Sequence, residues 1–244
     1  HGGALATVNV NTVAIQECNF TRNQANNGGA VNVVKATKFL SNKNCFSLNM
    51  AFENGGAIYG EKIEFIFNKN EIFEDNNARK MGGAESLSQI TFTTIYLVKL
   101  INNKAASNGA AILMSQSDHI SMIYCKILNN SKPLNGGALI ILKFRTFICF
   151  GTFFIRNTAK LAGGAIYAKD GITLEMWNSV FYYNTVSHFG GGLYIKTVEY
   201  IKNMNTSFIS NKSQGKRLKR VGKKSRIITK AGGAFQISHY HTLY

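Results

Sequence analysis

Residues 154–166 read FIRNTAKLAGGAI and contain the two motifs that repeat along the whole chain. One motif is a Gly-Gly-Ala tripeptide or a near relative, which begins at Gly2, Gly28, Gly55, Gly82, Gly109, Gly136, Gly163, Gly190 and Gly232. Successive starts lie 26, then six times 27, and finally 42 residues apart. Nine occurrences at nearly one period indicate a protein built from a repeating structural unit.

The other motif is a large apolar residue followed three positions later by Asn. Its pairs are Phe20/Asn23, Phe46/Asn49, Phe73/Asn76, Leu100/Asn103, Ile127/Asn130, Phe154/Asn157, Phe181/Asn184 and Phe208/Asn211. The apolar residue comes 18 positions after the first Gly in all eight complete units. Both motifs therefore belong to one repeating coil.

Alternation within the coil predicts short β-strands. The residue after each tripeptide is Leu5, Val31, Ile58, Glu85, Ile112, Leu139, Ile166, Leu193 or Phe235, and we expect this column and the one two positions later to face inward. The position between them, which is Asn32 or Tyr59 in early units, is mixed and is expected to face outward. A third apolar column includes Phe39 and Phe147, with Thr93 as its one polar member.

These patterns predict an all-β fold, a right-handed single-stranded parallel β-helix of about nine 27-residue coils with three short strands each. Paired Gly residues suit a tight corner, and Asn tolerates the left-handed conformation and can stack its amides between coils. A helical repeat is disfavoured because the units are rich in Ile, Val, Thr, Phe and Tyr. We interpret residues 1–244 as a single domain, expected to be a segment of a longer chain.

At these residues the chain resembles a known family. Phe154-Ile155-Arg156-Asn157 followed by Gly163-Gly164-Ala165-Ile166 is similar to the GGA[ILV] and FxxN repeats of chlamydial polymorphic outer-membrane proteins and of related protist surface proteins. The resemblance extends from Gly2 to about Ile237. It implies the β-helical region of a surface adhesin. Gly109-Ala110-Ala111 and Gly190-Gly191-Gly192 depart from the tripeptide, and no outer-membrane barrel is seen in the sequence.

Enzymes of β-helical architecture place clustered carboxylates along an outer face, whereas the 12 acids of this chain are scattered. Asp118 and His119 are adjacent in a predicted strand and should point to opposite faces. Glu85 alone breaks an inward apolar column, which marks either a ligand site or a local rearrangement near Arg79 and Lys80. His239, Tyr240 and His241 lack a third ligand for a metal. We therefore expect no catalytic residues, no metal and no cofactor.

The charge is concentrated near the end of the chain. Of 28 Lys and Arg residues against 12 acids, nine lie within 212–230, where 15 residues are inserted into the last coil. We predict a loop there that binds anionic glycan, acidic protein or lipid headgroups by charge, through Lys216, Arg217, Lys219, Arg220, Lys223, Lys224 and Arg226. Nucleic acid is disfavoured because no aromatic residue is interleaved for base stacking. A solvated loop without a specific partner is the alternative.

Cysteines and glycosylation sequons bear on the compartment. Cys18 and Cys125 share a column but lie four coils apart, while Cys18 and Cys45 are offset by one residue, so we expect buried free thiols rather than disulfides. The candidate glycosylation sites are Asn19, Asn129, Asn205 and Asn211. Asn211 also belongs to an FxxN corner, so the first three are favoured.

We interpret the chain as a non-enzymatic structural or adhesive β-solenoid, at a cell surface or in an extracellular filament or assembly. The alternatives are a carbohydrate-active β-helix of the lyase or hydrolase kind and an intracellular scaffold that binds acidic partners. Open coil ends predict end-to-end self-association. No apolar run reaches the roughly 18 residues that a membrane-spanning helix needs.

Overall fold

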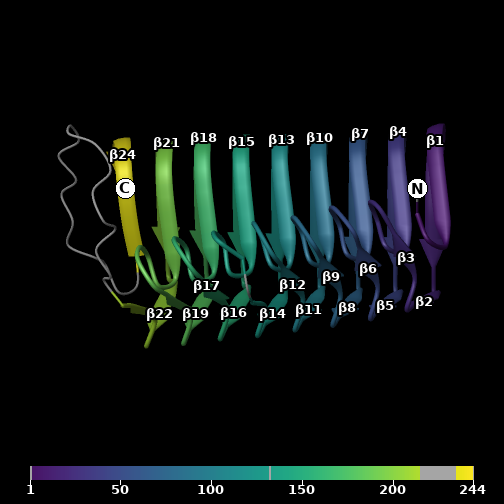
Figure 1. Ribbon diagram of the computed structural model, residues 1–244. Coiled ribbons are helices and arrows are strands. Elements are labelled where there is room, and N and C mark those ends of the chain that lie inside the picture. The colour runs from purple at the N-terminus through teal and green to yellow at the C-terminus, as the bar shows by residue number, and fades with distance from the viewer. Residues whose placement is uncertain (1, 132, 215–234, 244) are drawn as a thin grey trace, which may run out of the picture.

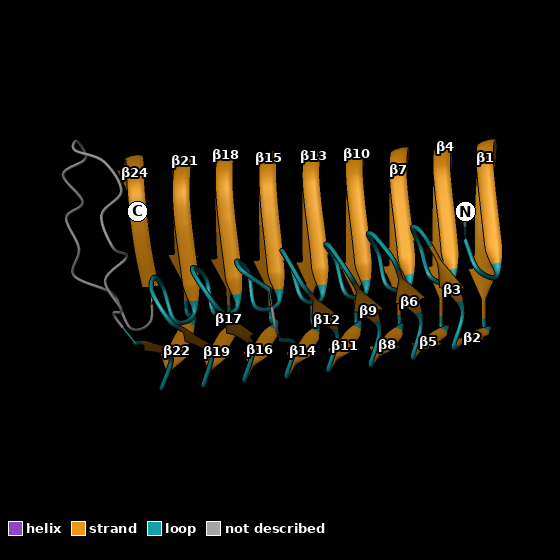
Figure 2. Cartoon of the chain, viewed as in Figure 1, coloured by secondary structure: helices purple, strands orange, loops and turns teal. Residues whose placement is uncertain are grey.

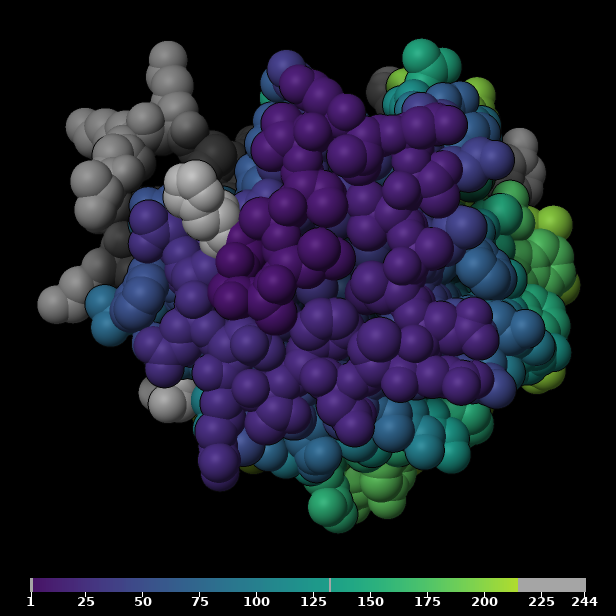
Figure 3. Space-filling view, turned by 90° about the vertical axis from the view of Figure 1, so that its right-hand side faces the viewer, coloured from purple at the N-terminus to yellow at the C-terminus, as the bar shows by residue number. Residues whose placement is uncertain are grey.

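The computed structural model describes residues 2–131 and 133–214 in full, and of β24 the backbone of Phe235–Leu243. The chain winds into coils that stack side by side, so that the same strand of each coil lies next to that of the following coil (Figures 1 and 2). Viewed from the N-terminal end, the first coil covers the coils behind it (Figure 3). All strand pairs in the described residues are parallel, and the prediction of a parallel β-solenoid is confirmed.

Long strands form a sheet of nine. They are β1 (Leu5–Gln16), β4 (Val31–Asn42), β7 (Ile58–Lys69), β10 (Glu85–Tyr96), β13 (Ile112–Ile123), β15 (Leu139–Phe150), β18 (Ile166–Trp177), β21 (Leu193–Met204) and β24 (Phe235–Leu243). Their register joins equivalent positions of successive units, as in Ile112 with Leu139. The described residues cover the first seven coils, apart from residue 132, and the eighth as far as residue 214, and the ninth contributes the backbone of β24.

Shorter strands complete each coil. An eight-stranded sheet contains β2 (Asn19–Thr21), β5 (Cys45–Ser47), β8 (Ile72–Glu74), β11 (Lys99–Ile101), β14 (Lys126–Leu128), β16 (Phe153–Ile155), β19 (Val180–Tyr182) and β22 (Ser207–Ile209). Two-residue strands follow, in two further sheets: β3 (Gln24–Ala25), β6 (Met50–Ala51), β9 (Asn77–Ala78) and β12 (Lys104–Ala105), then β17 (Thr158–Ala159), β20 (Thr185–Val186) and β23 (Lys212–Ser213).

The expectation of three short strands per coil was wrong in one respect, because the first strand is 12 residues long. It bends at its fifth residue, where Lys35 and its equivalents have a φ near +56°. A left-handed residue turns the chain without breaking the ladder to the next coil. Each coil has two further corners at left-handed residues, which are Lys43 and Leu48 in the second coil.

The Gly-Gly-Ala motif closes the coil as predicted. The first Gly has a positive φ, which is +65° at Gly55, and a Cβ on Gly56 would overlap the carbonyl oxygen of Gly83 in the next coil. Ala57 is fully buried beneath this turn. The close backbone approach between coils therefore requires the second Gly as well as the first.

The FxxN motif forms two ladders inside the stack. The rings of Phe46 and Phe73 are parallel with centroids 4.7 Å apart, and those of Phe154 and Phe181 are 4.6 Å apart. Each Asn amide forms a hydrogen bond with the equivalent Asn of the next coil. Asn103 Nδ2, for example, donates to Asn130 Oδ1 at 3.1 Å. Amide stacking is confirmed, but the left-handed residue is the one before the Asn, so that part of the expectation was wrong.

The inward columns are confirmed in the middle of the stack, where Val31, Ile58, Ile112 and Phe147 are almost fully buried. The position between the first two columns was expected to face outward and is instead buried in several coils, at Asn32, Ser86, Leu113 and Ile140. In the second coil the turn that precedes the tripeptide lies over this position, and Asn32 Nδ2 donates to the carbonyl oxygen of Asn27 in that turn.

Candidate functional site

Polar side chains occupy several positions of one column at the first corner after the long strands. Asn44 Oδ1 accepts a hydrogen bond from the backbone N–H of Cys18 at 2.8 Å. Farther along the stack, Ser179 Oγ accepts from the N–H of Thr152 at 3.2 Å. The column thus supplies acceptors to backbone groups that have no strand partner at the corner.

Glu71 occupies the same column in the third coil. Its Oε1 accepts from Ser41 Oγ at 3.0 Å and from Asn44 Nδ2 at 3.2 Å. Burial raises the pKa of the Glu71 carboxyl to about 7, although these hydrogen bonds act in the opposite direction. Glu71 was not among the residues predicted from the sequence. The available signal was its position in a column that otherwise holds small polar acceptors and apolar residues.

Glu85 lies at the start of β10 and is completely buried. Asn68 Nδ2 donates to its Oε1 at 2.6 Å. Burial is the main cause that raises the pKa of Glu85 to about 8, and the negative charge of Glu71 adds to the increase. The side chain is therefore expected to carry a proton at neutral pH.

Glu85 is not paired with the basic residues that the sequence analysis placed near it. Arg79 lies over the Phe52 ring, 4.7 Å from its centroid, and Lys80 forms an ion pair with Glu53 at 2.9 Å. Asn68 and Glu71 are its polar neighbours instead. Neither basic residue therefore neutralises Glu85.

Two carboxyl groups with raised pKa values often mark an acid–base site. Here neither Glu71 nor Glu85 has exposed surface, so a substrate at the surface of the stack does not reach them. One oxygen of each, Oε2, has no hydrogen-bond partner in the part of the chain that the structure describes. Both carboxyls lie inside the core, whereas glycoside cleavage uses two carboxyls that flank a bound sugar.

Half of the ten acids outside the core are engaged with bases. Within 2–131 and 133–214, ion pairs join Glu17 to Lys43, Glu61 to Lys62, Glu53 to Lys80, Asp118 to Arg145 and Asp170 to Lys169. His119 is not joined to Asp118 but stacks on Phe92 with centroids 5.1 Å apart. The described residues contain no group of three His, Cys, Asp or Glu side chains that could hold a metal ion.

The predicted contact and modification residues are partly described. The basic loop from Lys216 to Arg226 lies outside the described residues, as do the side chains of His239, Tyr240 and His241. Asn19, Asn129 and Asn205 are exposed, whereas Asn211 is half-buried and its Oδ1 accepts from Asn184 Nδ2 at 2.9 Å. The sequons stay a prediction.

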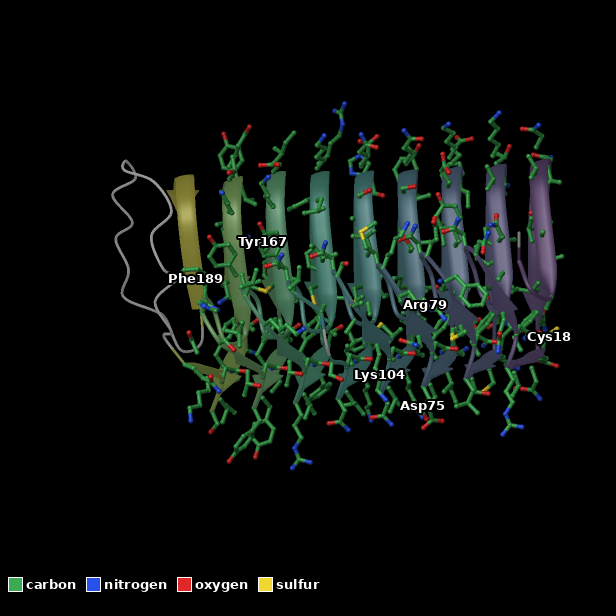
Figure 4. The ribbon with its side chains drawn as sticks, viewed as in Figure 1. Cys18, Asp75, Arg79, Lys104, Tyr167 and Phe189 are labelled. Carbon is green, nitrogen blue, oxygen red and sulfur yellow. The ribbon has the colours of Figure 1, made fainter. Side chains whose placement is uncertain are left out.

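All four cysteines are free, as expected. The expectation that they are all buried was wrong, because Cys18 is exposed in the first coil, at the N-terminal end of the stack (Figure 4). Cys45 is partly exposed because it faces outward from β5. Burial raises the pKa of Cys125 to about 12 and that of Cys149 to about 11. These two thiols are therefore unreactive at neutral pH.

An aromatic surface follows the corner at the end of the long strands and was also missed from the sequence. We call Tyr96, Tyr124, Phe150 and Trp177 the aromatic corner. Tyr124 makes edge contacts with Tyr96 and Phe150 on either side, at centroid distances of 6.3 and 5.4 Å. Trp177 Nε1 donates to Glu175 Oε2 at 3.0 Å. Four successive coils therefore present rings along one edge of the stack.

One comparison with known proteins gives a match. Residues 151–169 match the Chlamydia polymorphic membrane protein (Chlamydia_PMP) repeat. The matched segment contains the FxxN and Gly-Gly-Ala motifs quoted above, and the resemblance expected from the sequence is confirmed. No curated protein and no solved structure match the chain.

The match and the β-solenoid fold are consistent with a surface, adhesin-like structural protein. No helix in the described residues is long and apolar enough to cross a membrane. The repeated motifs are the part of the chain that matches a known family.

Proposed function

We propose that the chain is a non-enzymatic structural or adhesive β-solenoid that is exposed at a cell surface or built into an extracellular assembly. The match to the Chlamydia polymorphic membrane protein repeat carries this proposal. The interior location of Glu71 and Glu85 supports its non-enzymatic part, because the two carboxyls with raised pKa values lie away from any surface substrate.

A carbohydrate-active β-helix would need two carboxylates that converge on an outer face. Five of the outer acids are held in ion pairs, and His119 stacks on Phe92 rather than pairing with Asp118. An intracellular scaffold is the remaining alternative. It differs from the proposed function in one measurable respect, since a chain that stays in the cytosol receives no N-linked glycan.

Glycopeptide analysis of the protein from its natural source tests the proposal, together with protease treatment of intact cells. We expect glycan on Asn129, which is exposed at a corner, and cleavage of the protein from outside. Asn102 is a matched control, because it occupies the same corner one coil earlier with the same φ of 55° but has no sequon. Asn129→Gln should lower the mass by one glycan, and Asn102→Gln should not. Bare sequons and full protection from protease would overturn the surface role.

A further inference from the structure

A glycine in the next coil leaves room for the ring of Tyr124. Gly151 has a φ of +59°, and a Cβ added there would lie 2.5 Å from a ring atom of Tyr124. Equivalent corners carry side chains, such as Leu97 and Asn178. The ring of Tyr124 thus occupies the space of the missing side chain, while 49% of the residue stays exposed. A fixed and exposed ring is a preorganised surface for stacking.

Positive charge surrounds the aromatic corner. Lys69 Nζ lies 5.8 Å from the centroid of Tyr96, and Lys202 Nζ lies 4.4 Å from the ring centroid of Trp177. On the other side of the corner, Lys99 and Lys126 are directly paired on β11 and β14, and both are exposed.

Like charges that face each other on neighbouring strands are unfavourable. Neither Lys99 nor Lys126 forms an ion pair within residues 2–131 and 133–214. Glu175, an acid beside the aromatic corner, already accepts from Trp177, and Glu74 on β8 lies opposite Ile101 rather than opposite a lysine. A bound anion would therefore relieve the repulsion between the two lysines.

We propose that the aromatic corner binds an extended, negatively charged polysaccharide that runs along the axis of the solenoid. The proposal rests on the adhesive function and names its ligand class and site. The weakly positive C–H face of a sugar ring packs against the negative face of an aromatic ring. Carboxylate or sulfate groups of the polymer would lie near Lys99 and Lys126. Successive coils repeat at about 4.8 Å, so a polymer that runs along the axis passes one ring in each of four coils.

An acidic peptide fits this surface less well. A peptide that adds to a sheet needs unpaired backbone groups. At the corner these groups are used between coils, since Leu97 N–H donates to the carbonyl of Ile123 at 3.0 Å and Tyr124 N–H to that of Phe150 at 2.9 Å. The surface also follows an outer corner of the stack. Ring stacking and charge are the interactions that remain.

Titration of the whole chain with alginate oligosaccharides, which are polyuronates, tests the proposal by calorimetry at low and high salt. Tyr124→Ala should weaken binding about tenfold, as expected for the loss of one stacked ring. Its matched control is Tyr183→Ala, because Tyr183 is 48% exposed, has the same φ of 53° and also contacts a neighbouring ring edge-on. The control should change the affinity less than twofold.

A second pair of variants tests the charges. Lys99→Gln with Lys126→Gln should weaken binding about tenfold at low salt and reduce its salt dependence. Lys35→Gln with Lys143→Gln removes the same charge from the bend of the long strands, away from the corner, and should have little effect. The basic stretch at 212–230 is present in every variant and contributes equally to the measured affinity of each.

Poly-L-glutamate distinguishes the ligand class. The proposal is overturned if the peptide binds as tightly as alginate and Tyr124→Ala changes neither affinity, because charge alone would then explain both. It is also overturned if alginate does not bind. In either case, glycan on Asn129 and protease accessibility on cells would still support the surface role, so the two proposals fail separately.

Discussion

The core of the third and fourth coils differs in its side chains from that of the sixth and seventh, although the strands of both regions are arranged in the same way. Asn68, Glu71 and Glu85 are buried in the first region. The equivalent residues 81 positions later are Cys149, Thr152 and Ile166, which are also buried but carry no charge. Both regions keep the same strand register. The coil geometry is therefore set by the Gly-Gly-Ala and FxxN motifs, and the other inward columns tolerate different chemistry.

The Phe ladder should matter equally in both regions. Phe73→Ala and Phe154→Ala each remove a fully buried ring, and we expect each to destabilise its coil by about 3–5 kcal/mol. Hydrogen exchange resolved by coil is the appropriate measurement, because repeat proteins open locally. A much smaller cost at Phe73 would mean that the polar core is already loosely packed.

The Asn ladder should show the next largest effect. Asn157→Ala removes the acceptor for the Asn130 N–H at 3.0 Å and the donor to the Ile127 carbonyl at 2.9 Å. Leaving buried backbone groups unpaired should cost about 2–4 kcal/mol. Asn76→Ala is the counterpart in the polar region and should cost the same. Hydrogen exchange at the corner amides measures the effect of both substitutions. Unchanged protection of the Asn130 N–H in Asn157→Ala would contradict the assigned role of the ladder.

The two regions should respond differently to pH. The folded-state pKa of Glu85 is raised to about 8 from an ordinary value of 4.5, so the folded protein binds the proton more tightly than the unfolded chain. The stability of the fourth coil is therefore full below pH 4.5 and falls as the pH rises to about 8, by a few kcal/mol at about 1.4 kcal/mol per unit of pKa difference.

Glu85→Gln keeps the shape and the hydrogen bond to Asn68 but does not titrate. Denaturation followed between pH 4 and 9 should show a flatter profile for this variant than for the wild-type chain. Hydrogen exchange in the sixth and seventh coils serves as the internal control and should not follow this trend. An unchanged profile in Glu85→Gln would assign the pH dependence to another group, of which Glu71 is the first candidate.

Conversion of the polar region into the apolar one should have the smallest effect. Replacing Glu85 and Asn68 together by Leu removes a buried polar pair and continues the inward columns. Such exchanges are neutral or stabilising, and we expect a gain of about 1–2 kcal/mol at pH 8. Glu85→Leu alone should be less favourable because it leaves Asn68 Nδ2 unpaired. Thermal melts of the three proteins at pH 8 measure the order, and a less stable double variant would show that the pair specifies the packing.

The sequence by itself determined the 27-residue coil, the parallel stacking and the inward columns. Side chains alternate along a strand, and a repeat in register places equivalent residues next to each other, so that local patterns suffice. The position between the first two inward columns was predicted to face outward. It is buried in several coils instead, because a turn covers it from outside. That coverage depends on how the chain folds back and not on alternation.

The tertiary structure alone decided which non-equivalent residues meet. Asn68 and Glu85 are 17 positions apart and bond across the core because left-handed corners between them turn the chain back. Tyr124 lies on Gly151 because the next coil places a glycine under its ring. Such contacts join different columns of the coil, and their geometry depends on the angle at each corner, which the repeat period does not specify.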